Sequence, residues 1–408
     1  MRTLLEAALV QTPDEATAHA AYADYLTEEG DPRGEFVQVQ LALEEAGRSV
    51  AERKRLHTRE AELLSAHGKD WLGDLGRFLV GDWSGEDKPY HFEFRRGWLD
   101  FVRVLPEPSA LIDVLSRAPE ARLLRALEIV YDMRYHPFDF EPHTEGPNAA
   151  LAEGEDQGAV YDGMSPLPSL AESSYLTNLR VLKVGFSDTG ELAHSTQVDP
   201  FGGATAQQVL DLLAKCPRLE ELYLNTDLGV IDALFASPAL GPVRVLQYYY
   251  ATGYSHRDDG QGVAYPLSIL ANNPATRNLT TLRFHPGRDT TIDLGELDAL
   301  LQSPNLPALE HLQVHMTTFG DELCKPLIAS GIMKRLKTLD IGYGNLTDDG
   351  ARQLAACADT AKLDVLNVSR NALTAAGIAA LKKAGVRVVA EDQHAADETD
   401  YLYEVDRE

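Results

Sequence analysis

The sequence is poor in basic residues, in cysteine and in long apolar runs, and each shortage argues against a class of protein. Of its 408 residues, 37 are Lys or Arg and 63 are Asp or Glu, which gives a formal charge of −26. So acidic a chain does not favour the extended cationic face that follows a phosphate backbone. We therefore expect no nucleic-acid partner and regard a basic protein as the better electrostatic match.

The three cysteines are odd in number and widely separated, without CxxC or Cys/His spacing, and we expect buried free thiols: Cys216, Cys324 and Cys357. No run of about 18 apolar residues is present, and no positively charged start leads into an apolar segment. We therefore expect a cytoplasmic protein with no membrane partner. Phosphate-binding GxxxxGK[ST], GxSxG, HExxH and paired CxxC motifs are all missing, so we expect no enzyme, no cofactor and no metal.

One apolar pattern recurs from about residue 99 to the end of the chain. It reads as an apolar residue, two others, an apolar residue, one other and an apolar residue, and its later copies start 27 residues apart. A period in this range is typical of a solenoid. The nine copies are Leu99/Val102/Val104, Leu124/Leu127/Ile129, Leu179/Leu182/Val184, Leu219/Leu222/Leu224, Val243/Leu246/Tyr248, Leu279/Leu282/Phe284, Leu309/Leu312/Val314, Leu336/Leu339/Ile341 and Leu363/Leu366/Val368.

Each copy predicts a short strand, because its last two apolar residues alternate with polar ones. The segments between copies, such as 347–357 and 374–384, have apolar residues at helical spacing. One strand and one helix cannot bury their own apolar face, so the units must stack. We therefore predict an α/β solenoid over residues 79–390, with a curved parallel sheet inside, helices outside and a terminal strand at Val386 to Val389.

The best copies, LKTLDIGYGNLTDDGARQLA and LDVLNVSRNALTAAGIAALK, carry Thr347/Gly350 and Thr374/Gly377 at the same offsets. They resemble the leucine-rich repeat family, in its ribonuclease-inhibitor-like subtype. That resemblance implies a scaffold that binds a protein partner on its concave face. The chain departs from the family at the usual turn asparagine, which only Asn371 supplies.

Two regions interrupt or end the array. The insertion near 132–172 has eight acidic residues and no Lys or Arg between 139 and 172, which favours a mobile loop, with a flap over the concave face as the alternative. Two further connections, 187–204 and 252–265, are also long. The acidic ending, 391–408, is either a cap on the final repeat, through Tyr401, Leu402, Tyr403 and Val405, or a disordered tail.

Residues 1–78 do not follow the repeat and predict a small α-helical module. In YADYLTEEGDPRGEFVQVQ, Gly30 suits a helix end, Asp31 an N-cap and Pro32 the first position of the next helix. Together with FRRGWLDFVRV, this stretch resembles the bacterial repeat-companion domain, which implies an architecture and no chemistry. We interpret its carboxylates as a solvated face with caps, and Arg33 and Glu35 as either a salt bridge or a docking point.

The concave strand face is the best candidate site, because side chains between the buried strand residues point away from the core. Tyr and Arg are common anchors of protein interfaces. Three histidines also raise the question of a metal, but no nearby acid completes a ligand set in the sequence. The candidate partner-binding residues are Tyr223, Gln247, Tyr249, Arg283, His285, His311, Gln313 and His315.

The sequence therefore favours a non-catalytic protein-interaction scaffold. Two alternatives stay open: regulation of a small GTPase, by analogy to leucine-rich GTPase-activating proteins, and inhibition of a basic enzyme, as by an inhibitor or immunity protein. An enzyme would need a cleft with convergent polar groups, which no motif indicates.

Overall fold

The computed structural model describes residues 1–80, 90–104, 109–131, 167–186, 205–225, 231–249, 263–286, 290–315 and 317–395. The described chain forms two compact units, which we treat separately. The first holds residues 1–130, 167–182 and 211–219, and the second holds the other described residues. Most of the predicted acidic insertion, the connection 187–204 and most of the connection 252–265 lie outside the described residues. So do the four tail residues of the predicted cap, Tyr401, Leu402, Tyr403 and Val405.

Strands follow one another in chain order across a long, mostly parallel sheet. All nine predicted strands are present, and the terminal strand is confirmed as the last of the sheet. The strands of this sheet are β1 (Tyr90–Arg95), β2 (Trp98–Val104), β3 (Ala126–Tyr131), β4 (Val181–Phe186), β5 (Glu221–Asn225), β6 (Val245–Tyr249), β8 (Thr281–His285), β10 (His311–Val314), β11 (Thr338–Asp340), β12 (Val365–Asn367) and β13 (Arg387–Val389).

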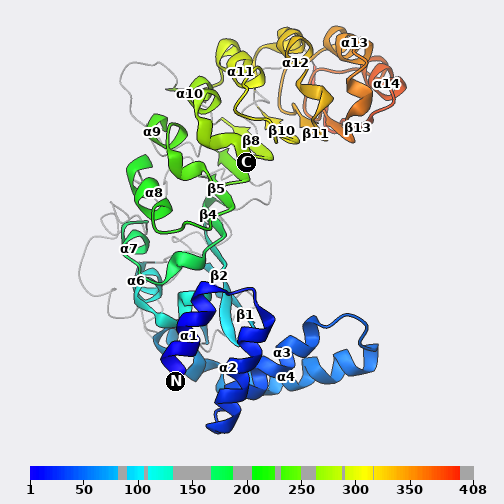
Figure 1. Cartoon of the computed structure of the whole chain (residues 1–408). Helices are drawn as coiled ribbons and strands as arrows, with labels where there is room; N and C mark the ends of the chain where they lie inside the picture. The colour runs from blue at the N-terminus through cyan, green and yellow to red at the C-terminus, as the bar shows by residue number, and fades with distance from the viewer. Residues whose placement is uncertain are drawn as a thin grey trace, which may run out of the picture. The chain divides into compact units, whose positions relative to one another are not determined.

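Helices connect successive strands, and in the second unit α10 to α14 lie on the opposite side of the sheet layer from the open face of β8 to β13 (Figure 1). The predicted α/β solenoid is thus the observed fold. The helices are α1 (Arg2–Gln11), α2 (Ala16–Glu28), α3 (Arg33–Glu44), α4 (Val50–Trp71), α5 (Gly76–Leu79), α6 (Ser109–Arg117), α7 (Leu167–Ala171), α8 (Ala206–Leu213), α9 (Asp232–Phe235), α10 (Leu267–Asn272), α11 (Leu294–Leu301), α12 (Cys324–Ser330), α13 (Asp348–Ala356) and α14 (Ala375–Lys383). A separate small sheet pairs β7 (Val263–Ala264) with β9 (Thr290–Thr291).

A ladder of leucines explains why the strands of the second unit stack in register. The central leucine of each strand lies beside that of its neighbour, and every one is at most 2% exposed. Burying one such side chain contributes about 1.5–3 kcal/mol. A slip by one residue would move the whole ladder to the opposite face, so burial fixes the register. The ladder is Leu222, Leu246, Leu282, Leu312, Leu339 and Leu366.

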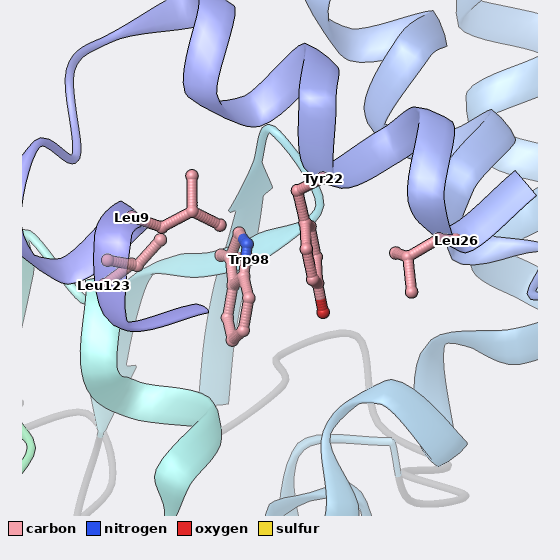
Figure 2. Close-up of a cluster of buried hydrophobic side chains, with 5 residues drawn as sticks. All are labelled: Leu9, Tyr22, Leu26, Trp98 and Leu123. Atoms are coloured by element: carbon pink, nitrogen blue, oxygen red, sulfur yellow. The ribbon is translucent and has the colours of Figure 1, made fainter. Parts of the chain in front are cut away.

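The first unit packs its helices around a buried aromatic cluster. Tyr22 of α2 stacks on Trp98 of β2, with ring centroids 5.7 Å apart, and Leu9, Leu26 and Leu123 surround the pair (Figure 2). All five side chains are at most 5% exposed. Tyr22 and Leu26 of α2 therefore form the contact between the helical module and the first strands.

An unpredicted antiparallel strand, β1, precedes the repeats and pairs with β2. The two strands join at Arg96 and Gly97, whose φ angles of 50° and 80° fit a tight two-residue hairpin turn. Helix α3 holds this turn, because Gln40 accepts from the Gly97 N–H at 2.7 Å and Glu44 accepts from the Arg96 guanidinium at 2.6 Å.

Arg33 and Glu35, the two residues with open roles at the start of α3, have different partners. Arg33 is 6% exposed, donates from Nε to the Gly97 carbonyl at 2.8 Å and lies 4.4 Å from the Trp98 ring. Glu35 instead forms an ion pair with Arg59 of α4, at 2.7 Å. Glu35 thus forms the predicted type of salt bridge, while burial removes Arg33 from any docking surface. Helix α3 begins just after Pro32, one residue later than predicted, and Asp31 accepts from the Arg33 N–H at 3.0 Å.

Asn371 has the predicted role of a turn asparagine. Its buried amide donates to the Ile341 carbonyl at 2.9 Å and accepts from the Leu346 N–H at 2.8 Å. A Cβ on Gly344, the equivalent position one repeat earlier, would lie 2.9 Å from the Asn371 side-chain oxygen. Gly344 thus leaves the space that the Asn371 side chain occupies. This accounts for one of the positions where the chain lacks the usual turn asparagine.

The Thr and Gly offsets shared by the last repeats belong to a second ladder, on the helix side. Asp348 accepts from the backbone N–H of Thr374 at 2.9 Å and from its hydroxyl at 2.6 Å. A Cβ on Gly377 would lie closer than 3.0 Å to the same carboxylate. The same arrangement occurs one repeat earlier, where Asp321 accepts from the Thr347 N–H at 2.8 Å and from its hydroxyl at 2.6 Å, and Gly350 lies beside the carboxylate. Glycine is therefore required where the next helix meets the carboxylate.

We predict that Gly377→Ala lowers the free energy of unfolding by about 1–3 kcal/mol, the usual cost of overpacking. Because alanine favours a helix more than glycine does, helix propensity alone would raise the free energy of unfolding by about 1 kcal/mol. A decrease would therefore show that the added Cβ clashes with Asp348. In an Asp348→Ala background the same substitution should cost less or stabilise. Denaturant unfolding of the four proteins measures the coupling, and equal effects of Gly377→Ala in both backgrounds would contradict this account.

Candidate functional site

The polar residues of the second unit's strands form rows across the concave face, because the parallel register places equivalent positions side by side. All eight predicted site residues fall in three rows. The first row is Glu221, Val245, Thr281, His311, Thr338 and Val365. The middle row is Tyr223, Gln247, Arg283, Gln313, Asp340 and Asn367. The end row is Asn225, Tyr249 and His285, with His315 just after β10.

A hollow of about 540 Å³ lies on this face over β8 to β13. Three predicted residues, Arg283, His311 and Gln313, line it and are partly exposed. Asp340 and Asn367 line it as well and were not predicted. The hollow therefore combines positive, negative and amide groups on one sheet.

The end row is packed rather than open. His285 is 2% exposed and His315 is 8% exposed. The Tyr343 ring lies over both, with centroids 5.4 Å and 4.9 Å away, and Tyr249 lies 5.4 Å from His285 on the other side. Tyr343 takes a left-handed backbone conformation, with φ of 52°, which is costly for a side chain of this size. The two histidines are therefore buried packing residues of the concave face.

Asp340 is an acidic residue beside the histidine pair that the sequence pattern did not reveal. Its carboxylate lies 2.9 Å from His315 Nε2 and accepts from Asn367 Nδ2 and the Gly342 N–H, both at 3.0 Å. Burial opposes its ionisation, but the charge and hydrogen bond of His315 outweigh burial and hold the pKa of Asp340 below its ordinary value. The spacing of the histidines did not reveal this acid, because it comes from the next repeat.

The protons between His315 and His285 depend on the charge of His315. When His315 is neutral and donates from Nε2 to Asp340, its Nδ1 accepts from His285 Nδ1, 3.0 Å away. When His315 is protonated, both of its nitrogens donate and His285 Nδ1 accepts. In either state His285 Nε2 is buried and has no hydrogen-bond partner in the described chain. Burial, with the neighbouring His315, lowers the pKa of His285 well below its ordinary value, so His285 is neutral at pH 7.

The third candidate histidine lies apart from this pair. His311 is in the first row, where its Nδ1 lies 2.9 Å from the Thr338 hydroxyl. Within the described ranges, no three His, Cys, Asp or Glu side chains are grouped in a way that could hold a metal ion. The three histidines thus divide into a buried pair and one partly exposed ring.

The remaining predicted residues are connected by hydrogen bonds between the rows. Gln247 is 1% exposed and donates to Asn225 at 2.8 Å. Tyr223 donates to Glu221 at 2.7 Å, and the Lys183 ammonium lies 5.1 Å from its ring centroid. Gln247 is therefore a supporting residue like the histidine pair, whereas Tyr223, Tyr249, Arg283, His311 and Gln313 remain partly exposed.

Comparisons with known proteins find structural neighbours only. No protein-family model matches the chain, and no curated protein matches it. A structural-genomics protein from Bacteroides fragilis has 15% identity, covers 85% of this chain and 86% of its own, and gives a TM-score of 0.40. An internalin from Listeria monocytogenes has 15% identity, covers 71% of this chain and 86% of its own, and gives a TM-score of 0.29.

The class of protein follows from the strands themselves: the chain is an α/β repeat solenoid. In the part of the chain that the structure describes, no helix combines the length and the apolar character needed to cross a membrane.

We predict that His285 makes the fold sensitive to mild acid. Unfolded His285 binds a proton near pH 6.5, whereas the folded residue does not, so the free energy of unfolding should fall below that pH by up to about 1.4 kcal/mol per pH unit. His285→Asn keeps a donor near the Nδ1 position and removes the titration. Between pH 7.5 and 5.5 it should lose less stability than the wild type.

Denaturant unfolding at several pH values measures this difference. His57→Asn is the matched control, because His57 is exposed on α4. His19 is also buried, and burial lowers its pKa, so some acid sensitivity should remain in every variant. Identical pH profiles of wild type and His285→Asn would contradict the neutral, buried assignment.

Proposed function

We propose that the protein is a non-catalytic interaction scaffold that binds a protein partner on the concave face of β5 to β11. The observation that carries the proposal is the alignment of partly exposed Tyr, Arg, His and Gln side chains in rows on a rigid sheet. Tyr and Arg bury much area and make directional bonds, which is why they dominate the energetics of many interfaces.

The packed end row supports this proposal by reducing the cost of binding. Side chains that are already held lose less freedom when a partner arrives, and about 0.5–1.5 kcal/mol is lost for each mobile side chain that must be fixed. Gln313 donates to the Tyr249 hydroxyl and Arg283 donates to Gln247 at 3.3 Å, so the exposed anchors are tied to the supporting residues. The face is preorganised for contact.

We infer a capping role for the N-terminal helical module. In the first unit, α3 holds the β1–β2 turn and α1 contacts the first repeat through the Glu6–Arg122 ion pair, at 2.6 Å. A solenoid exposes apolar ends unless a non-repeating element covers them. Neither GTPase regulation nor inhibition of a basic enzyme is favoured over the general scaffold role by a contact in the described residues.

Affinity capture from the native cell tests the proposed function. We predict that a variant with Tyr223→Ala, Tyr249→Ala and Arg283→Ala loses at least about 90% of the captured partner, because two or more interface anchors each contribute over 1 kcal/mol. The control variant carries Arg277→Ala, Lys325→Ala and Arg352→Ala on exposed positions outside the concave rows. It should capture the partner like the wild type.

Both variants must first show wild-type circular dichroism and unfolding midpoints. Equal capture by the wild type and the concave variant would contradict a partner site on this face. A loss in the control variant alone would place the partner on the helix side.

A further inference from the structure

Arg283 is a cation for which the described residues supply no ion-pair partner. It lies on β8 in the middle row, is half-buried, and its described hydrogen bond is to the neutral Gln247 side-chain oxygen, at 3.3 Å. That distance is at the long end for a hydrogen bond. Other arginines of the described chain do pair with a carboxylate, as Arg125 does with Asp100 and Arg103 with Glu128. Arg283 shares the lack of such a pair with Arg218 and Arg335, but among these three only Arg283 lines the concave hollow.

The carboxylate closest along the row is already committed. Asp340 lies two strands from Arg283, a Cα separation of about 10 Å from the strand spacing. It accepts from His315 and the Gly342 N–H on Oδ1 and from Asn367 on Oδ2, and these three bonds hold it on the far side of Gln313. The Gln313 amide nitrogen contacts the Tyr249 hydroxyl and His315 Nδ1, and in the described residues no hydrogen bond joins Gln313 to Arg283.

A second nitrogen group lies diagonally beside Arg283. His311 is one strand over and two residues nearer the strand start, about 8 Å away between Cα atoms. Both side chains line the hollow, together with the Thr281 and Thr338 side chains. Guanidinium, imidazole and hydroxyl groups therefore line the same hollow as Asp340.

We propose that Arg283 and His311 receive a carboxylate of the protein partner, from an Asp or Glu side chain. This rests on the proposed function and names the chemistry of its central contact. The planar guanidinium presents two parallel N–H groups that match a carboxylate, and a charge-assisted pair of this kind is about twice as strong as a neutral hydrogen bond. The net charge of −26 repels acids at long range, so this contact gives specificity at short range rather than a fast approach.

The test uses the full chain with selectively labelled Arg and His side chains, observed by NMR. The probes are three blocked tripeptides, Ac-Ala-Glu-Ala-NH2, its Gln analogue and its phosphoserine analogue, at the same ionic strength. We expect the Glu peptide to shift the Arg283 Nε–H and His311 ring signals saturably, with a Kd in the millimolar range, because a single charged contact supplies only a few kcal/mol. The Gln peptide should give no saturable shift.

Substitutions locate the contact. Arg283→Gln should weaken Glu-peptide binding by about tenfold or more, and Arg283→Lys, which keeps the charge and loses the paired N–H groups, should lie between it and the wild type. Arg277→Gln is the matched control, because it removes the same charge from an exposed position outside the hollow. It should bind like the wild type.

Three results would overturn the assignment: equal shifts with the Glu and Gln peptides, unchanged binding in Arg283→Gln, or saturable binding of the phosphoserine peptide alone. These outcomes are separate from failure of the proposed function. If the cell-capture experiment finds a partner on the concave face and Arg283→Gln alone does not weaken its capture, the scaffold role stands and the carboxylate site is wrong.

Discussion

The parallel pairing of β5 to β13 in one continuous register is the constraint on which the rest of the second unit depends. It places one leucine of each strand from β5 to β12 against the next, and these leucines are almost completely buried. The same register aligns the polar positions of each strand on the opposite face. The core and the candidate site are therefore two sides of one arrangement, and a change that shifts the register would damage both.

Polar contacts adapt this regular framework at particular repeats. Asn371 holds one turn, and Asp348 holds the start of one helix through Thr374. Glycine at 344 and 377 leaves the space that these side chains occupy. On the concave face, the Asp340, His315 and His285 contacts use the end of the strands in a similar way. Each contact links neighbouring repeats, so local polar bonds reinforce the stacking that apolar burial drives.

The sequence predicted the strands well because their signal is physical: apolar residues at fixed offsets mark the buried side of each strand. The shared face of Tyr223, Arg283 and His311 followed from the same alternation. The β1 strand was missed because it precedes the repeat and joins β2 through Arg96 and Gly97, a turn less distinctive than Asn-Gly or Asp-Gly.

Burial on the concave face could not be predicted from alternation alone. Gln247 and His285 occupy outward strand positions, yet their side chains are packed by neighbours from other repeats. Asp340 lies on β11 and contacts His315, which follows the neighbouring strand β10 and belongs to a different row. Neither the spacing within one strand nor the repeat period therefore relates the two residues. Such contacts depend on side-chain direction, which the repeat pattern does not encode.

Hydroxyl-radical footprinting of the free protein and of its complex with the captured partner tests the central claim most directly. The account predicts that partner binding lowers the modification rates of Tyr223, Tyr249 and His311, which are partly exposed on the concave rows. Modification of exposed residues on α11 to α14 should not change. Unchanged rates on the concave rows, with protection on these helices instead, would contradict the claim that the strand face is the binding surface.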